Sequence, residues 1–302
     1  MPDKLRILTW NIAEGRDTNP DLPDNVFIPQ ITEAIRKEAP DIVLLNEALR
    51  YRPPFGPDFN QPVRIAEGVG FEYAHWGHTV SMGLRAWKVV AVLSRFPLYT
   101  PIYHPVISNG GETTYGVIQV AAWIFEIDHL IFSLRFNAWS DSENRDGHHL
   151  ATSLAQLRSD AIIMAGDFNN ADGRIAGWHE FVAQSGLHNA YQGSVTSDGP
   201  IDHILYRGPY VSTDFAAPPA PPETSDHGYV VTNLLSQEAP PPPFPPPGAQ
   251  IRLQCLGHIP GSRWLDGVTT DGRVVLSPDT TGSGSRWRVH DAGGGAFHLE
   301  CL

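Results

Sequence analysis

A run of prolines near the C-terminal end limits what this chain can fold into more than any other feature. Residues 240–247 are all proline except Phe244. Proline fixes φ and has no amide hydrogen, so neither a helix nor a sheet continues through such a run. We expect an extended polyproline segment that rises ~3.1 Å per residue. The run therefore predicts a domain over residues 1–237, a linker over 238–249 and a small module over 250–302.

Composition predicts a folded protein with an acidic main domain. Of the 302 residues, 41% are hydrophobic and 18% are charged, which is typical of globular chains. Residues 1–237 hold 16 Lys and Arg against 27 Asp and Glu, a charge of −11 out of a total of −12. Because Lys and Arg supply most non-specific affinity for nucleic acid, this balance counts against a processive nuclease.

The termini and the cysteines limit the compartment and the chemistry. No apolar run approaches the ~20 residues that a membrane helix needs, and Met1–Lys4 lacks the basic and apolar parts of a signal peptide. We expect a cytoplasmic protein as written, or a secreted one if a leader has been removed. Two cysteines, Cys255 and Cys301, form neither a disulfide framework nor a zinc site.

The region before the prolines alternates apolar runs with two helical patterns. Many strands, several of them consecutive in the middle of the domain, favour an α/β (α+β) sandwich over a doubly wound parallel sheet. We expect helices over residues 26–37 and 145–158, and strands over 5–10, 41–46, 89–93, 117–127, 130–136, 161–165, 204–206 and 229–235.

Polar residues gather where these expected strands begin or end. They are Asn11, Glu47, Asp167, Asn169, Asp202, Asp226 and His227. Each alone could be a turn former or a capped strand end. Together they make an oxygen-rich set, which suits Mg²⁺ or Mn²⁺ better than zinc. Hydrolysis of a phosphate ester uses such groups to hold a metal, orient a water and stabilise charge on the phosphoryl oxygens.

Six short motifs occur in an order that resembles a known superfamily. The chain resembles the endonuclease/exonuclease/phosphatase superfamily over roughly residues 5–235, the group that includes pancreatic deoxyribonuclease, inositol polyphosphate phosphatases and neutral sphingomyelinases. The resemblance implies a four-layer α/β/β/α sandwich of the DNase I-like type. The motifs are Thr9-Trp10-Asn11, Asn46-Glu47, Leu93-Ser94-Arg95-Phe96-Pro97, Gly166-Asp167-Phe168-Asn169, Ile201-Asp202-His203-Ile204 and Ser225-Asp226-His227.

The resemblance also implies a metal site. Glu47 would be the main ligand of Mg²⁺ or Mn²⁺, with Asn11 and Asp226 near it.

The resemblance further implies a group of residues around the scissile phosphate. Asp167 would position or activate the water, and Asn169 would donate to the phosphate. His227 would contact the phosphate as a base or as a stabilising cation, and Asp202 would support His227 or the metal.

Arg135 departs from the family pattern. It stands where the family usually has a histidine, at the end of the strand before Gly166. Arginine can bind phosphate through two nitrogens, but it does not exchange protons near neutral pH. We therefore predict a metal-dependent phosphoester hydrolase acting on a small molecule, a lipid headgroup or a nucleotide. A nuclease of the same superfamily and a degenerate phosphate-binding or adaptor protein are the alternatives. Arg135 itself could contact phosphate or make an ordinary salt bridge.

The last module contains an internal echo. Residues 253–256 and 299–302 are related sequences 46 residues apart. The module resembles one lobe of a β-trefoil of the ricin-B or fascin-like kind. Such a lobe could bind a sugar or a protein, or could be a partial module without a ligand. Assembly of three lobes and truncation of a longer chain both stay open.

Overall fold

The computed structural model describes the main domain with several gaps and parts of the last module. The described residues are 3–15, 27–51, 59–81, 86–107, 113–136, 141–170, 175–193, 200–222, 224–237, 250–251, 264–268, 273–277, 287–293 and 296–301. The chain divides into two compact units, Met1–Gln237 and Glu238–Leu302. The expected linker over 238–249 lies outside the described residues.

The first sheet of the larger unit is mixed. Its strand order is β12-β13-β1-β2-β5-β4, with β3 paired to β2, and only the β1–β2 pair is parallel among these neighbours. The strands are β1 (Lys4–Asn11), β2 (Ile42–Tyr51), β3 (Phe59–Asn60), β4 (Tyr73–Ser81), β5 (Ala86–Ser94), β12 (Tyr210–Ala216) and β13 (Val230–Ser236).

The second sheet has a similar plan. Its order is β10-β11-β9-β8-β7-β6, and β8–β9 is the parallel pair. The strands are β6 (Tyr99–Ile107), β7 (Thr113–Ile124), β8 (Ile127–Arg135), β9 (Ala161–Asp167), β10 (His188–Asn189) and β11 (Asp202–Arg207).

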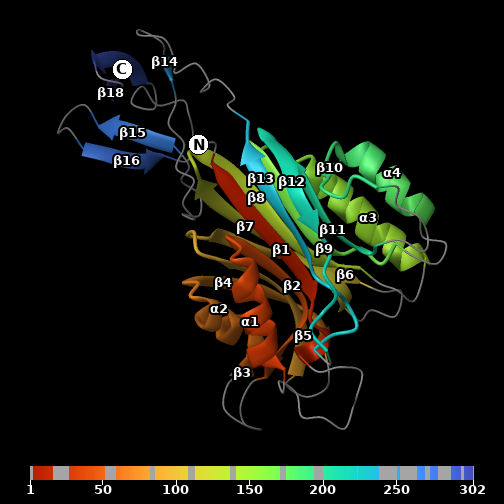
Figure 1. Ribbon diagram of the computed structural model, residues 1–302. Coiled ribbons are helices and arrows are strands. Elements are labelled where there is room, and N and C mark those ends of the chain that lie inside the picture. Colours follow the sequence, from red (N-terminus) through yellow and green to blue (C-terminus); the bar gives the residue numbers. More distant parts are fainter. Residues whose placement is uncertain are drawn as a thin grey trace. The chain divides into compact units, whose positions relative to one another are not determined.

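Helices cover the outer face of each sheet, and the two sheets pack against each other (Figure 1). The helices are α1 (Ile28–Glu38) and α2 (Gln61–Val69) on the first sheet, and α3 (Asp141–Ala155) and α4 (Ile175–Ser185) on the second. A short 3₁₀ turn, η1 (Ala13–Gly15), follows β1. The domain is thus the α/β/β/α sandwich that the sequence predicted.

Continuous apolar strands follow from burial on both faces. Alternate side chains of a strand point to opposite faces. Ile7 and Leu44 therefore pack between the sheets, whereas Leu8 and Val43 pack under α1 and α2. The second sheet repeats the arrangement, with Phe132 under α3 and α4. Such strands carry no polar alternation, as expected for sheets covered on both sides.

The sequence missed several elements and displaced others. It did not predict α2, α4, β4, β6 or β12. The first helix starts two residues later than expected, and α3 covers 141–155 rather than 145–158. The β2 strand extends well past Asn46 to Tyr51 because its partner β5 is longer than the expected apolar run.

The smaller unit contains short antiparallel strands. A three-stranded sheet has the order β14-β17-β18, and β15 pairs with β16. These strands are β14 (Gln250–Ile251), β15 (Trp264–Val268), β16 (Arg273–Ser277), β17 (Trp287–Gly293) and β18 (Ala296–Cys301). The β-trefoil resemblance stays a prediction, and its residues 253–256 lie outside the described segments. None of the described helices is long and apolar enough to cross a membrane.

Candidate active site

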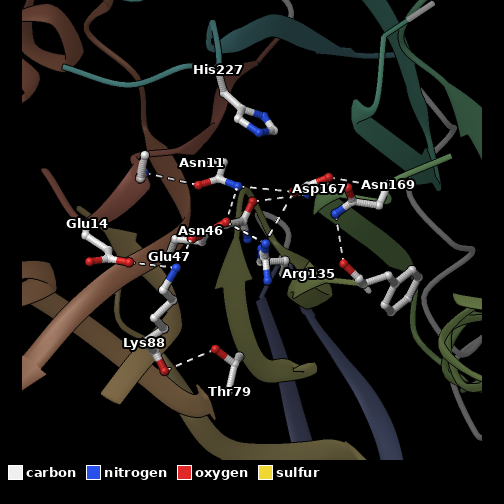
Figure 2. A network of polar contacts seen from close by, with 12 residues as sticks. Asn11, Glu14, Asn46, Glu47, Thr79, Lys88, Arg135, Asp167, Asn169 and His227 are labelled. Carbon is white, nitrogen blue, oxygen red and sulfur yellow. Dashed lines mark hydrogen bonds and ion pairs between the residues drawn. The ribbon is translucent and has the colours of Figure 1, made fainter. Parts of the chain in front are cut away.

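The sandwich brings the predicted polar residues from both sheets to one edge. In the first sheet, Asn11 of β1 lies beside Asn46 of β2. In the second sheet, Arg135, Asp167 and Asp202 form one row across β8, β9 and β11. Parallel strands end at the same edge, so the β1–β2 and β8–β9 pairs both deliver their last residues there. Figure 2 shows the resulting network of polar contacts.

Glu47 enters this network through an irregularity in β2. The pairing of β2 with β5 shifts register between Leu45 and Ala48, and Glu47 has a positive φ of 51°. A β-bulge redirects a side chain that regular alternation would send elsewhere. The left-handed backbone of a residue other than glycine stores strain, and such strain is characteristic of functional positions.

Lys88 binds the Glu47 carboxylate from β5. Its Nζ lies 2.5 Å from Glu47 Oε2 and 2.7 Å from Glu14 Oε1, so it bridges two acidic side chains (Figure 2). Burial alone would lower the pKa of Lys88, but the charges and hydrogen bonds of Glu47 and Glu14 together raise it. Lys88 is therefore a permanent cation in the neutral pH range.

Arg135 binds the other oxygen of Glu47. Its Nη2 lies 2.6 Å from Glu47 Oε1, and its Nε lies 3.7 Å from Asp167 Oδ2. The guanidinium also stacks over the Tyr115 ring at 4.4 Å, a cation–π contact. Burial by itself would raise the pKa of Glu47, but Arg135 and Lys88 together lower it to about 2.

Asp167 is held by hydrogen bonds from both sheets. Its amide donates to Asn46 Oδ1 at 3.1 Å, and its Oδ2 accepts from Asn11 Nδ2 at 3.1 Å. Burial raises the pKa of Asp167, and the neighbouring charge of Asp202 raises it further. Gly166 makes this placement possible, because a Cβ there would lie 1.9 Å from the Leu134 carbonyl oxygen.

Asn169 completes the turn after β9. Its φ is 46°, its amide donates to Asp167 Oδ1 at 3.0 Å, and its Nδ2 donates to the Phe136 carbonyl at 2.8 Å.

His227 and Asp202 form a hydrogen-bonded pair beside this network. The His227 Nδ1 lies 2.7 Å from Asp202 Oδ2. Two contacts fix the chain around the ring: the His227 amide donates to Ser225 Oγ, and its carbonyl accepts from Trp10 Nε1. Burial opposes the charged imidazole, but the bond and charge of Asp202 raise the His227 pKa to about 10. The ring is therefore an imidazolium near neutral pH, and Figure 2 shows it facing the Asn11–Asp167 contact.

A hollow lies on the outer side of the pair. Its volume is about 490 Å³, and Ile201, Pro218 and Pro219 line it together with Asp202, Asp226 and His227. Pro218 and Pro219 thus form an apolar wall beside the imidazole. Asp226 is exposed on this wall. Among the described residues, no hydrogen bond or ion pair joins it to Glu47 or Asn11.

The donors around Glu47 do not fit the expected Mg²⁺. Both Glu47 oxygens already accept from cations, and Oε1 also accepts from Asn11 Nδ2 at 2.9 Å. Asn11 turns its nitrogen inward because its oxygen accepts from the Ala13 amide. Mg²⁺ needs oxygen lone pairs at about 2.0–2.1 Å in octahedral arrangement. Within the described ranges, no three His, Cys, Asp or Glu side chains are grouped to hold an ion.

Sequence reasoning missed three members of the network: Glu14, Lys88 and Asn46. Lys88 is a lone lysine within the apolar strand β5, and that isolation was a usable signal. Asn46 was quoted in a motif but given no role. It is fully buried and donates to the Leu134 carbonyl at 2.7 Å, so it ties the two sheets together.

Other histidines near the motifs have structural positions. His148 of α3 is buried and stacks on Phe181 of α4. Burial lowers its pKa to about 4. His203 is buried and stacks on Trp178, with 4.1 Å between the ring centroids.

Comparison with known proteins agrees with this fold. A family model described as "Endonuclease/Exonuclease/phosphatase family" matches residues 8–227. No curated protein matches the chain. The fold and the arrangement of its polar edge define a DNase I-like α/β sandwich. The chain belongs to the endonuclease/exonuclease/phosphatase family, whose members are hydrolases that act on phosphoester bonds.

Three solved structures illustrate the likeness in fold. An endonuclease/exonuclease/phosphatase from Beutenbergia cavernae is 20% identical, with 99% of this chain and 100% of that chain covered and a TM-score of 0.66. One from Bacteroides vulgatus is 15% identical, with coverage of 78% and 100% and a TM-score of 0.60. The human Nocturnin catalytic domain is 18% identical, with coverage of 78% and 95% and a TM-score of 0.57.

Proposed function

We propose that residues 1–237 hydrolyse a phosphoester by attack of a water that Asp167 activates. The observation that supports this most is the 2.7 Å pair between His227 Nδ1 and Asp202 Oδ2, beside a buried Asp167 that is paired in register with Asp202. Hydrolysis needs a base and a fixed cation on opposite sides of one small space. The three residues supply both.

Asp167 is suited to be the base. Its raised pKa makes it a better proton acceptor near neutral pH than an exposed aspartate would be. The bonds from Asn11 and Asn169 hold the carboxylate in one orientation. A water bound to it would lose its proton to Asp167 as its oxygen attacks phosphorus. The bond from phosphorus to the ester oxygen would break, and the leaving oxygen would depart as the anion and take up a proton from solvent.

His227 is suited to stabilise the charge that develops on the phosphate. Asp202 occupies Nδ1, which leaves Nε2 as the ring donor for a non-bridging oxygen. Because the pKa of His227 is raised to about 10, the ring stays charged without help from the substrate. Asn169, which the family resemblance placed beside the phosphate, would donate to the same group.

The charge of the domain and the hollow favour a small substrate. An acidic domain repels polyanions, and the apolar wall of Ile201, Pro218 and Pro219 offers contact to an organic substituent of the ester. We therefore favour a phosphodiester or phosphomonoester of a small molecule, lipid headgroup or nucleotide. Magnesium or manganese at Glu47, which the family resemblance implied, has no part in this mechanism, because Lys88 and Arg135 already bind both Glu47 oxygens.

Turnover of bis-p-nitrophenyl phosphate by the full chain tests the proposal. The variants Asp167→Asn and His227→Ala should each reduce turnover by roughly 10²–10⁴-fold, with unchanged circular dichroism. Glu67→Gln serves as the matched control, because Glu67 is exposed on α2, and it should retain most activity.

Full activity in Asp167→Asn would overturn the assignment. Turnover of duplex DNA alone within a panel of phosphoesters would instead indicate the nuclease alternative. Phosphate binding without turnover of any ester would indicate the binding or adaptor alternative.

A further inference from the structure

We infer that Lys88 and Arg135 occupy the place of a divalent ion at Glu47, so that the site binds and hydrolyses its phosphoester without a metal there. The inference rests on the proposed function and concerns the source of positive charge in the same site. It departs from the magnesium expectation, and the contacts of Glu47 are the reason.

Both carboxylate oxygens of Glu47 are already bound to cationic side chains. Its Oε2 accepts from Lys88 Nζ at 2.5 Å, and its Oε1 accepts from Arg135 Nη2 at 2.6 Å. Both distances are those of charge-assisted hydrogen bonds. An ion bound to either oxygen at about 2.1 Å would sit directly beside one of these cations. Coulomb repulsion would therefore force the ammonium or the guanidinium out.

Neither the Lys88 ammonium nor the Arg135 guanidinium is easily displaced from Glu47. Lys88 is also bound to Glu14 Oε1 at 2.7 Å, and its side chain is only 21% exposed. Arg135 is 12% exposed, stacks on Tyr115 and reaches toward Asp167. Displacement of either would leave a charge in a poorly solvated place, which is costly.

The charges of the side chains around Glu47 balance one another. Glu14 and Glu47 carry two negative charges, and Lys88 and Arg135 carry two positive charges, as a single divalent ion would. The Asp202–His227 pair is neutral as an ion pair. Of the carboxylates Glu14, Glu47, Asp167 and Asp202, only Asp167, the proposed base, keeps its negative charge in this sum, and the His227 imidazolium can bind the phosphoester beside it.

Electron paramagnetic resonance of Mn²⁺ with the full, chelator-treated chain tests the inference directly, because bound Mn²⁺ loses the signal of the free ion. The unmodified chain and the Glu47→Gln variant should take up the same amount of Mn²⁺, because no ion binds at Glu47. Lys88→Met frees one oxygen of Glu47 while keeping the length of the stem. It should gain one Mn²⁺ per chain, and Glu47→Gln in the same chain should remove it.

Two controls separate charge from packing. Lys88→Arg keeps the cation and should take up no Mn²⁺. Lys37→Met, on the exposed face of α1, should behave as the unmodified chain. If Lys88→Met does not fold, Arg135→Met frees the other oxygen and serves in its place. One stoichiometric Mn²⁺ in the unmodified chain, abolished by Glu47→Gln, would overturn the inference.

Turnover provides the second readout. Hydrolysis of bis-p-nitrophenyl phosphate should be the same in EDTA as in millimolar Mg²⁺, whereas turnover that strictly requires added Mg²⁺ would overturn the inference. If no phosphoester is hydrolysed under any condition, the proposed function fails instead. The Mn²⁺ titration still decides the question of the site in that case.

Discussion

The two halves of the candidate site pair acids with cations in different ways. At one half, Glu47 is held by Lys88 and Arg135, whose charges do not titrate near neutral pH. At the other, Asp202 is held by His227, whose charge is favoured mainly by that carboxylate. The charges of Lys88 and Arg135 in the first half are therefore fixed, whereas the charge of His227 in the second half can change with pH. We conclude that loss of a charge should damage folding in the first half and change pH dependence in the second.

Glu47→Gln tests the first half and should have the largest effect. It leaves two poorly exposed cations without their carboxylate, and we expect a loss of about 3 kcal/mol in the free energy of unfolding. Glu33→Gln is the matched control, because its pair with Arg36 is about half exposed and worth little. Urea denaturation of both variants measures the difference.

The pH dependence of the same pair sharpens this prediction. The folded pKa of Glu47 is about 2 and its ordinary value is 4.5, so its stabilisation is complete above pH 4.5 and is lost as pH falls through about 2. The difference in stability between the unmodified chain and Glu47→Gln should therefore shrink over that interval. A constant difference would contradict the account.

Gly166→Ala tests how the two halves are joined and should have an intermediate effect. The φ of Gly166 is 147°, and an added Cβ would lie 1.9 Å from the Leu134 carbonyl oxygen, so we expect a loss of roughly 2 kcal/mol. Gly70→Ala is the control: its φ is also positive, at 83°, but nothing lies within 4 Å of the added carbon. Equal losses in the two variants would mean that backbone strain alone matters.

Asp202→Asn tests the second half and should have the smallest effect on folding. Without the carboxylate, the pKa of His227 should fall from about 10 toward its ordinary value of 6.5. The stabilisation from this pair is present below pH 6.5 and is lost as pH rises through about 10. The alkaline limb of kcat/KM should move down within that interval, and a ¹⁵N titration of the imidazole should follow it.

Asp226→Asn provides the comparison for that shift. Asp226 also raises the pKa of His227, but it is the weakest of the named causes and makes no hydrogen bond to the ring. The alkaline limb of kcat/KM should therefore move much less in Asp226→Asn than in Asp202→Asn. Equal shifts in the two variants would mean that the His227–Asp202 bond has no special role.

The sequence was sufficient for the architecture and for most residues at the edge. Apolar strands and short motifs predicted Asn11, Asp167 and Asp202 at one edge, because strand ends determine where such residues go. It could not predict the partners of Glu47. Lys88 lies 41 residues away on another strand, and its direction depends on the register of β5 and on the bulge at Glu47.

Adjacent positions in the sequence also proved a poor guide to shared roles. Asp226 and His227 are neighbours, and both were assigned to the site. The imidazole turns inward to Asp202, whereas Asp226 is exposed. The chain bends at these two residues, and their side chains point to different places.

Asn46 has a mechanical consequence for catalysis. The two sheets meet through aliphatic side chains. Hydrophobic contact is not directional, so it does little to fix the position of one sheet relative to the other. Asn46 belongs to the first sheet but bonds the Leu134 carbonyl and the Asp167 amide of the second, and these bonds are directional. Asn46 therefore fixes the position of one sheet relative to the other. Proton transfer at the site requires that this position be held accurately.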